Sequence, residues 1–281
     1  MQVLAALCFL VLAHLPPLRG EVVESFKKGP HCLDFFYKGM VPKWNVPKRH
    51  TVYLCQRFNN RYHFATLYNT DHRIAIYSAY RFQTGDDGGR EDYWYIEPQL
   101  VNMSWNAEME DERMLRNEDN INVDFGKKQA LDEDYRGSIY DRGHLNPNGH
   151  HTEDSRTATF TLTNVVPQNR DLNQRVWNEY ETDLQGDLRK CTQAYVLVGA
   201  IPSADNWIVK NNIKRVNIPD RIWNAYCCLG NNGRPLDSGG AIALNTDQSR
   251  VKRHTLSELK LLLGQYTKSP VGELFHNNCE A

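Results

Sequence analysis

The sequence lacks a long apolar segment beyond its first residues, and it lacks a net charge of either sign. After residue 20, no apolar run approaches the roughly 20 residues that a membrane-spanning helix needs. The chain has 33 Lys and Arg against 34 Asp and Glu, a formal net charge of −1. This balance is unlike that of a protein with a broad basic face for nucleic acid. Phosphate binding would depend on a local cluster such as Arg142, Arg170 and Arg175, unless these arginines only keep the surface soluble.

Internal repeats, low-complexity tracts and linkers are also absent, which favours one domain over residues 21–281. The apolar run Gln2–Leu15 ends at Pro16-Pro17 and is followed by the small residue Gly20. This pattern predicts a secretory signal peptide over residues 1–20, although the usual positive charge before the run is missing. We therefore expect a secreted, soluble, extracellular protein with no membrane attachment. Loss of Arg19 with the signal would leave 32 basic and 34 acidic residues.

Seven cysteines fall to six once Cys8 leaves with the signal peptide. An even number in an exported chain indicates disulfide bonds rather than free core thiols. Six cysteines allow 15 connectivities. We expect Cys32 to pair with Cys55, and the other four to join the region of Cys191 to the Cys227-Cys228 pair and the C-terminus. The sequon Asn102-Met103-Ser104 is a candidate glycosylation site.

The run Tyr140–Pro147, with sequence Tyr-Asp-Arg-Gly-His-Leu-Asn-Pro, places an acid, a cation and an imidazole side by side before a turn signal. A histidine titrates near neutral pH, so His144 can take a proton from water. A guanidinium can hold a phosphate oxygen through paired hydrogen bonds, which suits Arg142 to phosphate ester hydrolysis. Asp141 is predicted either to orient the strand or a neighbouring cation, or to cap the turn.

Two further runs follow in a fixed order, Asn-Val-Val-Pro-Gln at 164–168 and Leu-Asn-Gln…Trp…Glu at 172–181. Together with Asp-Arg-Gly-His at 141–144, they resemble the DNA/RNA non-specific endonucleases of the ββα-metal (His-Me finger) class. Among these the chain is most similar to the secreted vertebrate endonuclease domain-containing 1 proteins, from about Cys32 to Cys279. The resemblance implies an α+β fold, a central antiparallel sheet flanked by helices, and cleavage of DNA and RNA with little sequence preference.

The resemblance also implies roles for individual residues. It makes His144 the general base and Asn173 the only direct protein ligand of one Mg²⁺, with Mn²⁺ as an alternative. An amide oxygen suits such a hard cation, which keeps several of its waters. The family glutamate that matches Glu181 holds metal-bound water. Eight residues of helix place Glu181 roughly 12 Å from Asn173, too far to bind the same cation directly with ease. Read alone, Asn173 is a common residue of a first helical turn and Glu181 is a solvent-facing side chain.

Three arginines complete the expected site. The family arginine that matches Arg142 grips the substrate phosphate, and Arg175 is expected to contribute to substrate binding. Arg90 best fits a family arginine that stabilises the transferring phosphate, although the local spacing departs from the family pattern.

The pattern of the remaining chain predicts the elements around this site. Asp171 and Gln174 have the three-residue spacing of a helix N-cap, so a helix should begin near Leu172 with one buried stripe. A capping box at Thr255–Glu258 should open a second helix. We expect a hairpin over 62–82, strands over 157–163, 194–200 and 222–228, a connecting loop over 85–89, and a solvated charged loop with a short helix over 106–136.

Two other interpretations remain open from the sequence. His144, His150 and His151 with Asp141 could form a zinc site, although no cysteine and no His-Glu-x-x-His spacing accompanies them. Alternatively, the chain is a catalytically weak or inactive nuclease-like fold that binds nucleic acid or a protein, since a fold does not guarantee activity. The near-neutral charge favours this second alternative, and the presence of His144, Asn173 and Glu181 together weighs against it.

Overall fold

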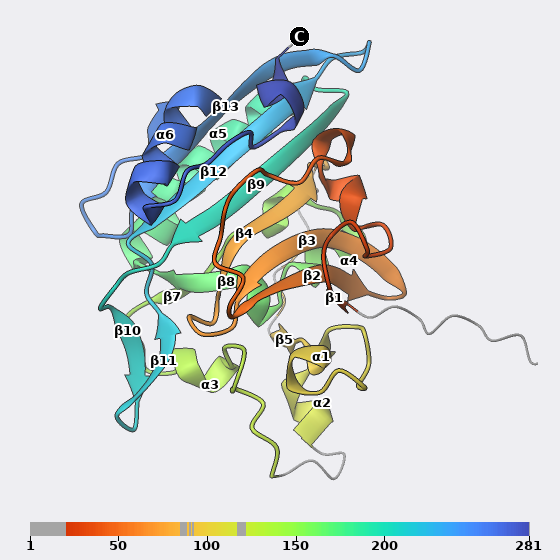
Figure 1. The fold of residues 1–281 in the computed structure, drawn as a ribbon. Helices are drawn as coiled ribbons and strands as arrows, with labels where there is room; N and C mark the ends of the chain where they lie inside the picture. Colours follow the sequence, from red (N-terminus) through yellow and green to blue (C-terminus); the bar gives the residue numbers. More distant parts are fainter. Residues whose placement is uncertain (1–20, 85–88, 90, 92, 117–121, 281) are drawn as a thin grey trace, which may run out of the picture.

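The computed structural model describes residues 21–84, 89, 91, 93–116 and 122–280. The expected signal peptide, Arg90 and residues 85–88 of the expected loop lie outside this part of the chain. Within it, an eight-stranded antiparallel sheet forms the centre of the molecule (Figure 1). In spatial order its strands are β1 (Val22–Val23), β2 (Thr51–Phe58), β3 (Arg61–Asn69), β4 (Ile74–Arg81), β9 (Gln193–Ile201), β12 (Arg221–Leu229), β13 (Pro235–Leu244) and β14 (Lys252–His254).

Both faces of this sheet are covered by buried apolar residues. Successive side chains of a strand point to opposite faces, so each strand contributes to both. On β9, Val196 and Val198 belong to one hydrophobic cluster and Leu197 belongs to the other. Helix α5 (Trp177–Leu188) packs on the first face, and helix α6 (Leu256–Thr267) packs on the second (Figure 1). The chain is therefore a three-layer α+β fold, and the α+β expectation is confirmed.

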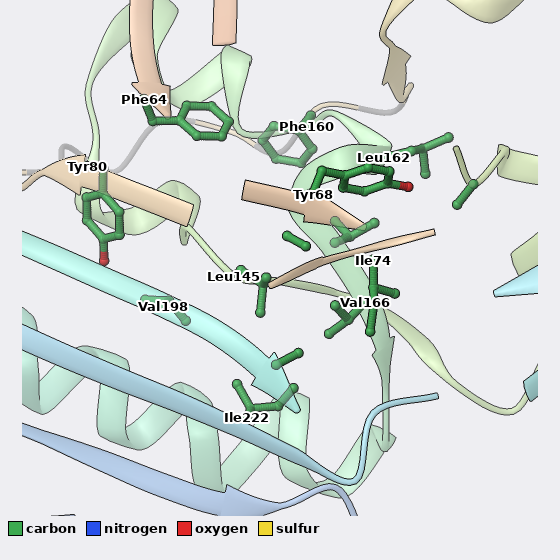
Figure 2. Packing of buried hydrophobic residues seen from close by; sticks show 14 of the residues in the cluster. Phe64, Tyr68, Ile74, Tyr80, Leu145, Phe160, Leu162, Val166, Val198 and Ile222 are labelled. Carbon is green, nitrogen blue, oxygen red and sulfur yellow. The ribbon is translucent and has the colours of Figure 1, made fainter. Parts of the chain in front are cut away.

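The first cluster joins the candidate site to the sheet. Figure 2 shows Leu145 and Val166, from the segments that carry the sequence motifs, among Ile74, Val198 and Ile222 of the sheet. All five side chains are almost fully buried. The motif segments are thus anchored on the central strands by apolar packing.

One glycine is needed where two strands and a large ring meet. A Cβ on Gly199 of β9 would lie 2.3 Å from the carbonyl oxygen of Ile76 and 2.5 Å from the ring of Trp223. A side chain at this position would displace the buried Trp223, so only glycine lets β9 pass at this distance.

Several expectations about local structure are confirmed. The hairpin over 62–82 is β3 and β4, and the strands over 194–200 and 222–228 are β9 and β12. Thr255 and Glu258 form the capping box of α6. The cysteines pair as Cys32–Cys55, Cys191–Cys228 and Cys227–Cys279, which agrees with the expected local pair and with the joining of the other four.

Two expectations are wrong. Residues 157–163 do not form a strand: α4 (Glu153–Ala158) occupies the first two positions, and a 3-10 turn begins at Leu162. The hydroxyls of Thr161 and Thr163 each donate to Oε1 of Glu97 at 2.7 Å, so these threonines serve a buried polar cluster and not a strand face.

The charged stretch 106–136 is also more than a solvated loop. Four of its apolar residues are buried in the first cluster: Met109, Leu115, Phe125 and Leu131. They are spaced irregularly between charged residues, so no periodic pattern in the sequence indicates their burial. It contributes the short elements β6 (Glu110–Asp111), α2 (Glu112–Arg116) and α3 (Asp132–Tyr135), beside β5 (Tyr95–Ile96) and α1 (Pro98–Val101).

No helix in the described part of the chain is both long and apolar enough to cross a membrane.

Two buried carboxyl groups make the stability of this fold depend on pH. Glu21 and Glu97 are both 0 % exposed, and burial followed by the charge of Glu97 raises the pKa of Glu21 well above its usual value. The folded state therefore binds this proton more tightly than the unfolded chain. The resulting stabilisation is present below the unfolded pKa, about 4.3, and is lost as the pH rises through the folded pKa.

We expect the free energy of unfolding to fall as the pH rises above about 4.3, by at most about 1.4 kcal/mol per pH unit from this group. Glu97→Gln keeps an oxygen for Thr161 and Thr163 but removes the charge, so its profile should be flatter. Urea unfolding at a series of pH values measures this, with the exposed Glu179→Gln as control. An equally steep Glu97→Gln profile would contradict the assignment.

Candidate active site

The Asp-Arg-Gly-His run forms a short strand, β7 (Asp141–His144), paired antiparallel with β8 (Val165–Gln168). His144 lies opposite Val165, and Asp141 lies opposite Gln168. A Cβ on Gly143 would come within 2.0 Å of the side chain of Gln168, which is fully buried. The glycine of the run is therefore required by close packing within this pair of strands.

His144 ends β7 in a half-buried, aromatic environment. The imidazole lies with ring centroids 5.3 Å from Trp94 and 4.9 Å from Phe160, and it meets Phe160 nearly edge-on at 81°. These rings restrict the rotamers of His144. A base held in one orientation by packing needs little reorganisation when a water molecule is presented to it.

The turn that follows His144 is fixed by a buried asparagine. Asn164 Nδ2 donates to the carbonyl oxygens of Asn146 and Thr159, and its Oδ1 accepts from the Asn146 N–H at 3.0 Å and from the Ser78 hydroxyl of β4 at 3.0 Å. The backbone N–H of Leu145 donates to the Asn164 carbonyl at 2.8 Å. Asn164, in the Asn-Val-Val-Pro-Gln run, thus connects β7 to the central sheet.

The helical segment that carries Asn173 begins near Leu172 as expected, but the residue that caps it lies two positions before the expected Asp171. Asn169 is the cap: its Oδ1 accepts from the backbone N–H groups of Asp171 at 3.0 Å and Leu172 at 3.3 Å. Asp171 has helical dihedrals and makes no cap hydrogen bond. Asn169 is itself held by a 2.7 Å bond from its N–H to Asn245, a contact that local spacing does not reveal.

The wider π-helical turn η5 (Leu172–Val176) precedes α5 and presents Asn173 toward β7. Asn173 Nδ2 donates to Oδ2 of Asp141 at 3.0 Å, and Gln174 Nε2 donates to the same oxygen at 2.8 Å. Asp141 thereby orients the amide of Asn173 and leaves its Oδ1 without a hydrogen bond from the described residues. Of the two roles expected for Asp141, the structure favours orientation: its Oδ2 holds the two amides, and its Oδ1 lies 3.4 Å from Nε of the cationic Arg170.

This arrangement fits a hard divalent cation with few protein ligands. One amide oxygen with a carboxylate beside it leaves most coordination positions to water, as Mg²⁺ prefers. Among the described residues no group of three or more His, Cys, Asp or Glu side chains gathers for a metal. The donor set is therefore unlike a structural zinc site.

Arg142 is already engaged on the other side of β7. Its Nη2 donates to Oδ1 of Asp132 at 2.5 Å and to the Asp132 carbonyl at 3.2 Å, and its guanidinium lies 5.7 Å from the ring centre of Trp94 and 5.3 Å from that of Tyr135. Its buried Nε has no hydrogen-bond partner among the described residues. A phosphate that binds Arg142 must therefore compete with the carboxylate of Asp132.

Glu181 lies on α5, eight residues after Asn173, and keeps partial exposure to solvent. Desolvation raises its pKa to about 8, and a hydrogen bond with Trp177 opposes this shift. A carboxyl group that is protonated at neutral pH can hold a hydrated cation only after it releases that proton.

His150 and His151 are structural, and the alternative zinc site is wrong. His150 bonds the Tyr80 hydroxyl through Nδ1 at 2.8 Å and the Glu181 carbonyl through Nε2 at 3.1 Å, while His151 Nε2 lies 2.6 Å from Asn146 Oδ1. Burial lowers the pKa of His150 to about 4 and that of His151 well below its usual value. These neutral rings tie α5 and the turn after His144 to the sheet.

The remaining arginines are differently placed. Arg175 is exposed on η5 and approaches the carboxylate of Asp171 at 4.0 Å, and Arg170 Nε lies 3.4 Å from Asp141. Each arginine of the expected cluster is thus faced by a carboxylate, including Arg142. Arg90, which is predicted to stabilise the transferring phosphate, lies outside the described residues.

Two residues of the site are not evident from the sequence pattern: Asp132, which holds Arg142, and Trp94, which packs against His144. Asp132 lies ten residues before Arg142 within the charged stretch, where nothing in its spacing separates it from its acidic neighbours. Only the position of α3 beside β7 shows that it holds Arg142.

Comparisons with a family model and with curated proteins agree on the family to which this chain belongs. The family model of DNA/RNA non-specific endonucleases matches residues 45–281. The human protein named endonuclease domain-containing 1 protein is 33% identical over 268 residues, which covers 93% of this chain and 50% of that protein. The mouse protein of the same name is 35% identical over 205 residues, covering 70% and 38%. The chain thus spans half or less of the length of these relatives.

Shorter matches and a solved structure agree. Human mitochondrial endonuclease G is 39% identical over 75 residues, 26% of this chain and 25% of that protein. A crystal structure of the EndoG/EndoGI complex, described as showing the mechanism of EndoG inhibition, superposes with a TM-score of 0.56 at 13% identity, covering 89% of this chain and 93% of that chain. This likeness supports the fold, in which β7, β8 and α5 form a ββα unit.

Proposed function

Because the chain belongs to the DNA/RNA non-specific endonuclease family, we propose that it is a metal-dependent endonuclease that hydrolyses phosphodiester bonds in DNA and RNA with little sequence preference. The observation that carries this proposal is the hydrogen bond from Asn173 to Asp141. It connects the proposed metal ligand to the four-residue strand that ends in His144. Three residues of strand place His144 about 10 Å along β7 from Asp141.

In the proposed mechanism, His144 accepts a proton from the attacking water, and Trp94 and Phe160 keep its ring in place. Asn173 would hold the cation through Oδ1, and a cation there supplies positive charge against the charge that develops on the phosphate and the leaving oxygen. Arg142 exchanges Asp132 for a phosphate oxygen of the substrate, and Arg175 contacts a neighbouring phosphate. Glu181, once deprotonated, holds water near the site.

We also propose that the protein is secreted after removal of residues 1–20 and that residues 21–281 form one domain. Three disulfides support an oxidising compartment. Asn102 is exposed in a turn where its Oδ1 accepts from the Ser104 hydroxyl, which makes it accessible for glycosylation. Mass analysis of protein collected from culture medium would show a chain that begins at Glu21, and a retained N-terminal segment would contradict the proposal.

A second candidate is a weak or inactive member that binds nucleic acid or a protein. The pairing of Arg142 with Asp132 favours it, because the carboxylate competes with substrate phosphate. The ordered Asp141–Asn173 contact weighs against it, since a scaffold without metal chemistry does not need that amide fixed on the strand that ends in His144.

Removal of divalent cations separates the two candidates. The oxidised secreted protein should nick supercoiled plasmid and cut unrelated RNA when Mg²⁺ is present, and EDTA should abolish both reactions. Gel electrophoresis of the products over time measures both. Cleavage should be distributed over many sites, because contacts to phosphates carry no sequence information. Equal cleavage with EDTA and with Mg²⁺, or none with either, would reject the metal-dependent enzyme.

A further inference from the structure

We infer that the ribbon formed by β10 (Trp207–Lys210) and β11 (Ile213–Asn217) is a second contact for duplex nucleic acid beside the active site. In Figure 1 these two strands extend away from the central sheet, next to α3 and near β7. They are joined by Asn211-Asn212, which both have positive φ. Such a turn is typical of a tight hairpin whose twist matches its strands.

The base of the ribbon is anchored and its tip is free. Ile208 and Val216 are buried in the first hydrophobic cluster, and the Asn217 side chain bonds the backbone of Ser203 in both directions at 2.9 Å. In contrast, Val209 is 52% exposed and Ile213 is 59% exposed. The part of the ribbon that is free to meet a partner is therefore its tip, around the Asn211-Asn212 turn.

The ribbon is rigidly connected to the candidate active site through α3. Arg215 Nε of β11 donates to Oδ1 of the buried Asp134 at 2.7 Å, and Asp132 on the same helical turn holds Arg142. Lys210 Nζ also donates to the carbonyl oxygen of Arg136, just after α3. A duplex whose phosphate reaches Arg142 therefore passes close to the ribbon.

The charge around the ribbon differs from that of the catalytic arginines. The arginines at 142, 170 and 175 each face a carboxylate. In contrast, four lysines on the ribbon and on the segment 127–128 beside it form no ion pair with any described residue. Arg73 connects these segments, with Nη1 donating to Arg215 O and Nη2 to Lys127 O. The carboxylates of Asp124, Glu133 and Asp205 lie on the same segments. The four lysines are Lys127, Lys128, Lys210 and Lys214.

A duplex fits this surface better than a protein partner does. Unpaired lysines release counterions when they meet phosphates, and this release is the main source of affinity for nucleic acid. A major groove about 12 Å wide admits a two-stranded ribbon such as the exposed tip of β10 and β11. In a chain with a net charge of −1, these lysines supply the phosphate attraction that the carboxylate-paired arginines lack.

The inference rests on the proposed function for its substrate class, and binding tests it without catalysis. In a His144→Ala background, affinity for a labelled 20-base-pair duplex is measured by fluorescence anisotropy between 50 and 200 mM salt. Lys210→Gln with Lys214→Gln should lower the slope of log K against log salt by about 1.8, from roughly 0.9 per phosphate contact. Lys252→Gln with Lys268→Gln, an equal charge change on β14 and after α6, should leave the slope unchanged.

Equal slopes for the ribbon pair, the control pair and the parent would overturn the inference and leave the exposed tip to another partner, such as a protein. A reduced slope in the ribbon pair supports it even if the parent chain never nicks plasmid. In that case the enzymatic proposal fails while the ribbon remains a nucleic-acid contact. Circular dichroism of both pairs confirms that the fold is intact.

Discussion

Replacement of His144 by alanine is expected to lower the initial rate of plasmid nicking about 10²- to 10⁴-fold, the range for loss of a positioned general base. The ring of His144 packs against Phe160 and Trp94, with ring centroids 4.9 and 5.3 Å away, whereas β7 pairs with β8 through backbone groups, so removal of the ring leaves this strand pairing in place. The effect should therefore appear in kcat with little change in the thermal midpoint. Initial rates at saturating Mg²⁺ measure it.

The matched control is His31→Ala. His31 is exposed on the second face of the sheet, where its Nδ1 lies 3.1 Å from Asp34. Its loss changes the histidine count equally but should leave the nicking rate unchanged. If His144→Ala retains the parent rate while His31→Ala also does, then His144 is not the base and the proposed mechanism fails.

Removal of the Asp141 carboxylate is expected to raise the Mg²⁺ concentration for half-maximal activity about 10- to 100-fold, the usual loss when a group that orients a metal ligand is removed. Without the 3.0 Å bond from Asn173 Nδ2, the amide can rotate and its Oδ1 is no longer held toward the cation. Asn173→Ala, which removes the ligand itself, should have the larger effect. Titration of nicking rate against Mg²⁺ distinguishes both from a general loss of activity.

Gln174→Ala is the control for this series. Gln174 donates to the same Asp141 oxygen at 2.8 Å, but it is not the proposed ligand, so its loss should shift the Mg²⁺ titration less than loss of Asp141 does. A normal Mg²⁺ titration in Asp141→Ala, with only the maximal rate lowered, would show that Asp141 does not position a metal ligand.

The strands were predictable because their signal is local. The apolar run at 194–200 and the β-formers at 222–228 became β9 and β12, and the alternation of β9 distributes its side chains to both clusters. The even number of cysteines in an exported chain predicted disulfides, and the pairing of Cys32 with Cys55 follows from the neighbouring position of the N-terminal segment and β2.

The helix cap and the strand at 157–163 were mispredicted for a shared reason. Asp171 and Gln174 had suitable spacing, but Asn169 took the cap because Asn245, 76 residues away, holds its backbone. Thr161 and Thr163 alternate as in a strand, but their hydroxyls donate hydrogen bonds to the buried carboxyl group of Glu97. In each case a partner distant in sequence supplied a hydrogen bond that outweighed a weak local preference.

The sequence by itself determined the order of the motifs, the identity of His144 and Asn173 as candidate groups, and half of the strands of the central sheet, namely β3, β4, β9 and β12. The tertiary structure decided which groups face each other: Asp141 on Asn173, Asp132 on Arg142, and α3 between β7 and the basic ribbon. The physical reason is that periodicity and turn chemistry act over a few residues. The partner of a charged or amide side chain is set only when packing of the whole chain brings distant segments within hydrogen-bond distance.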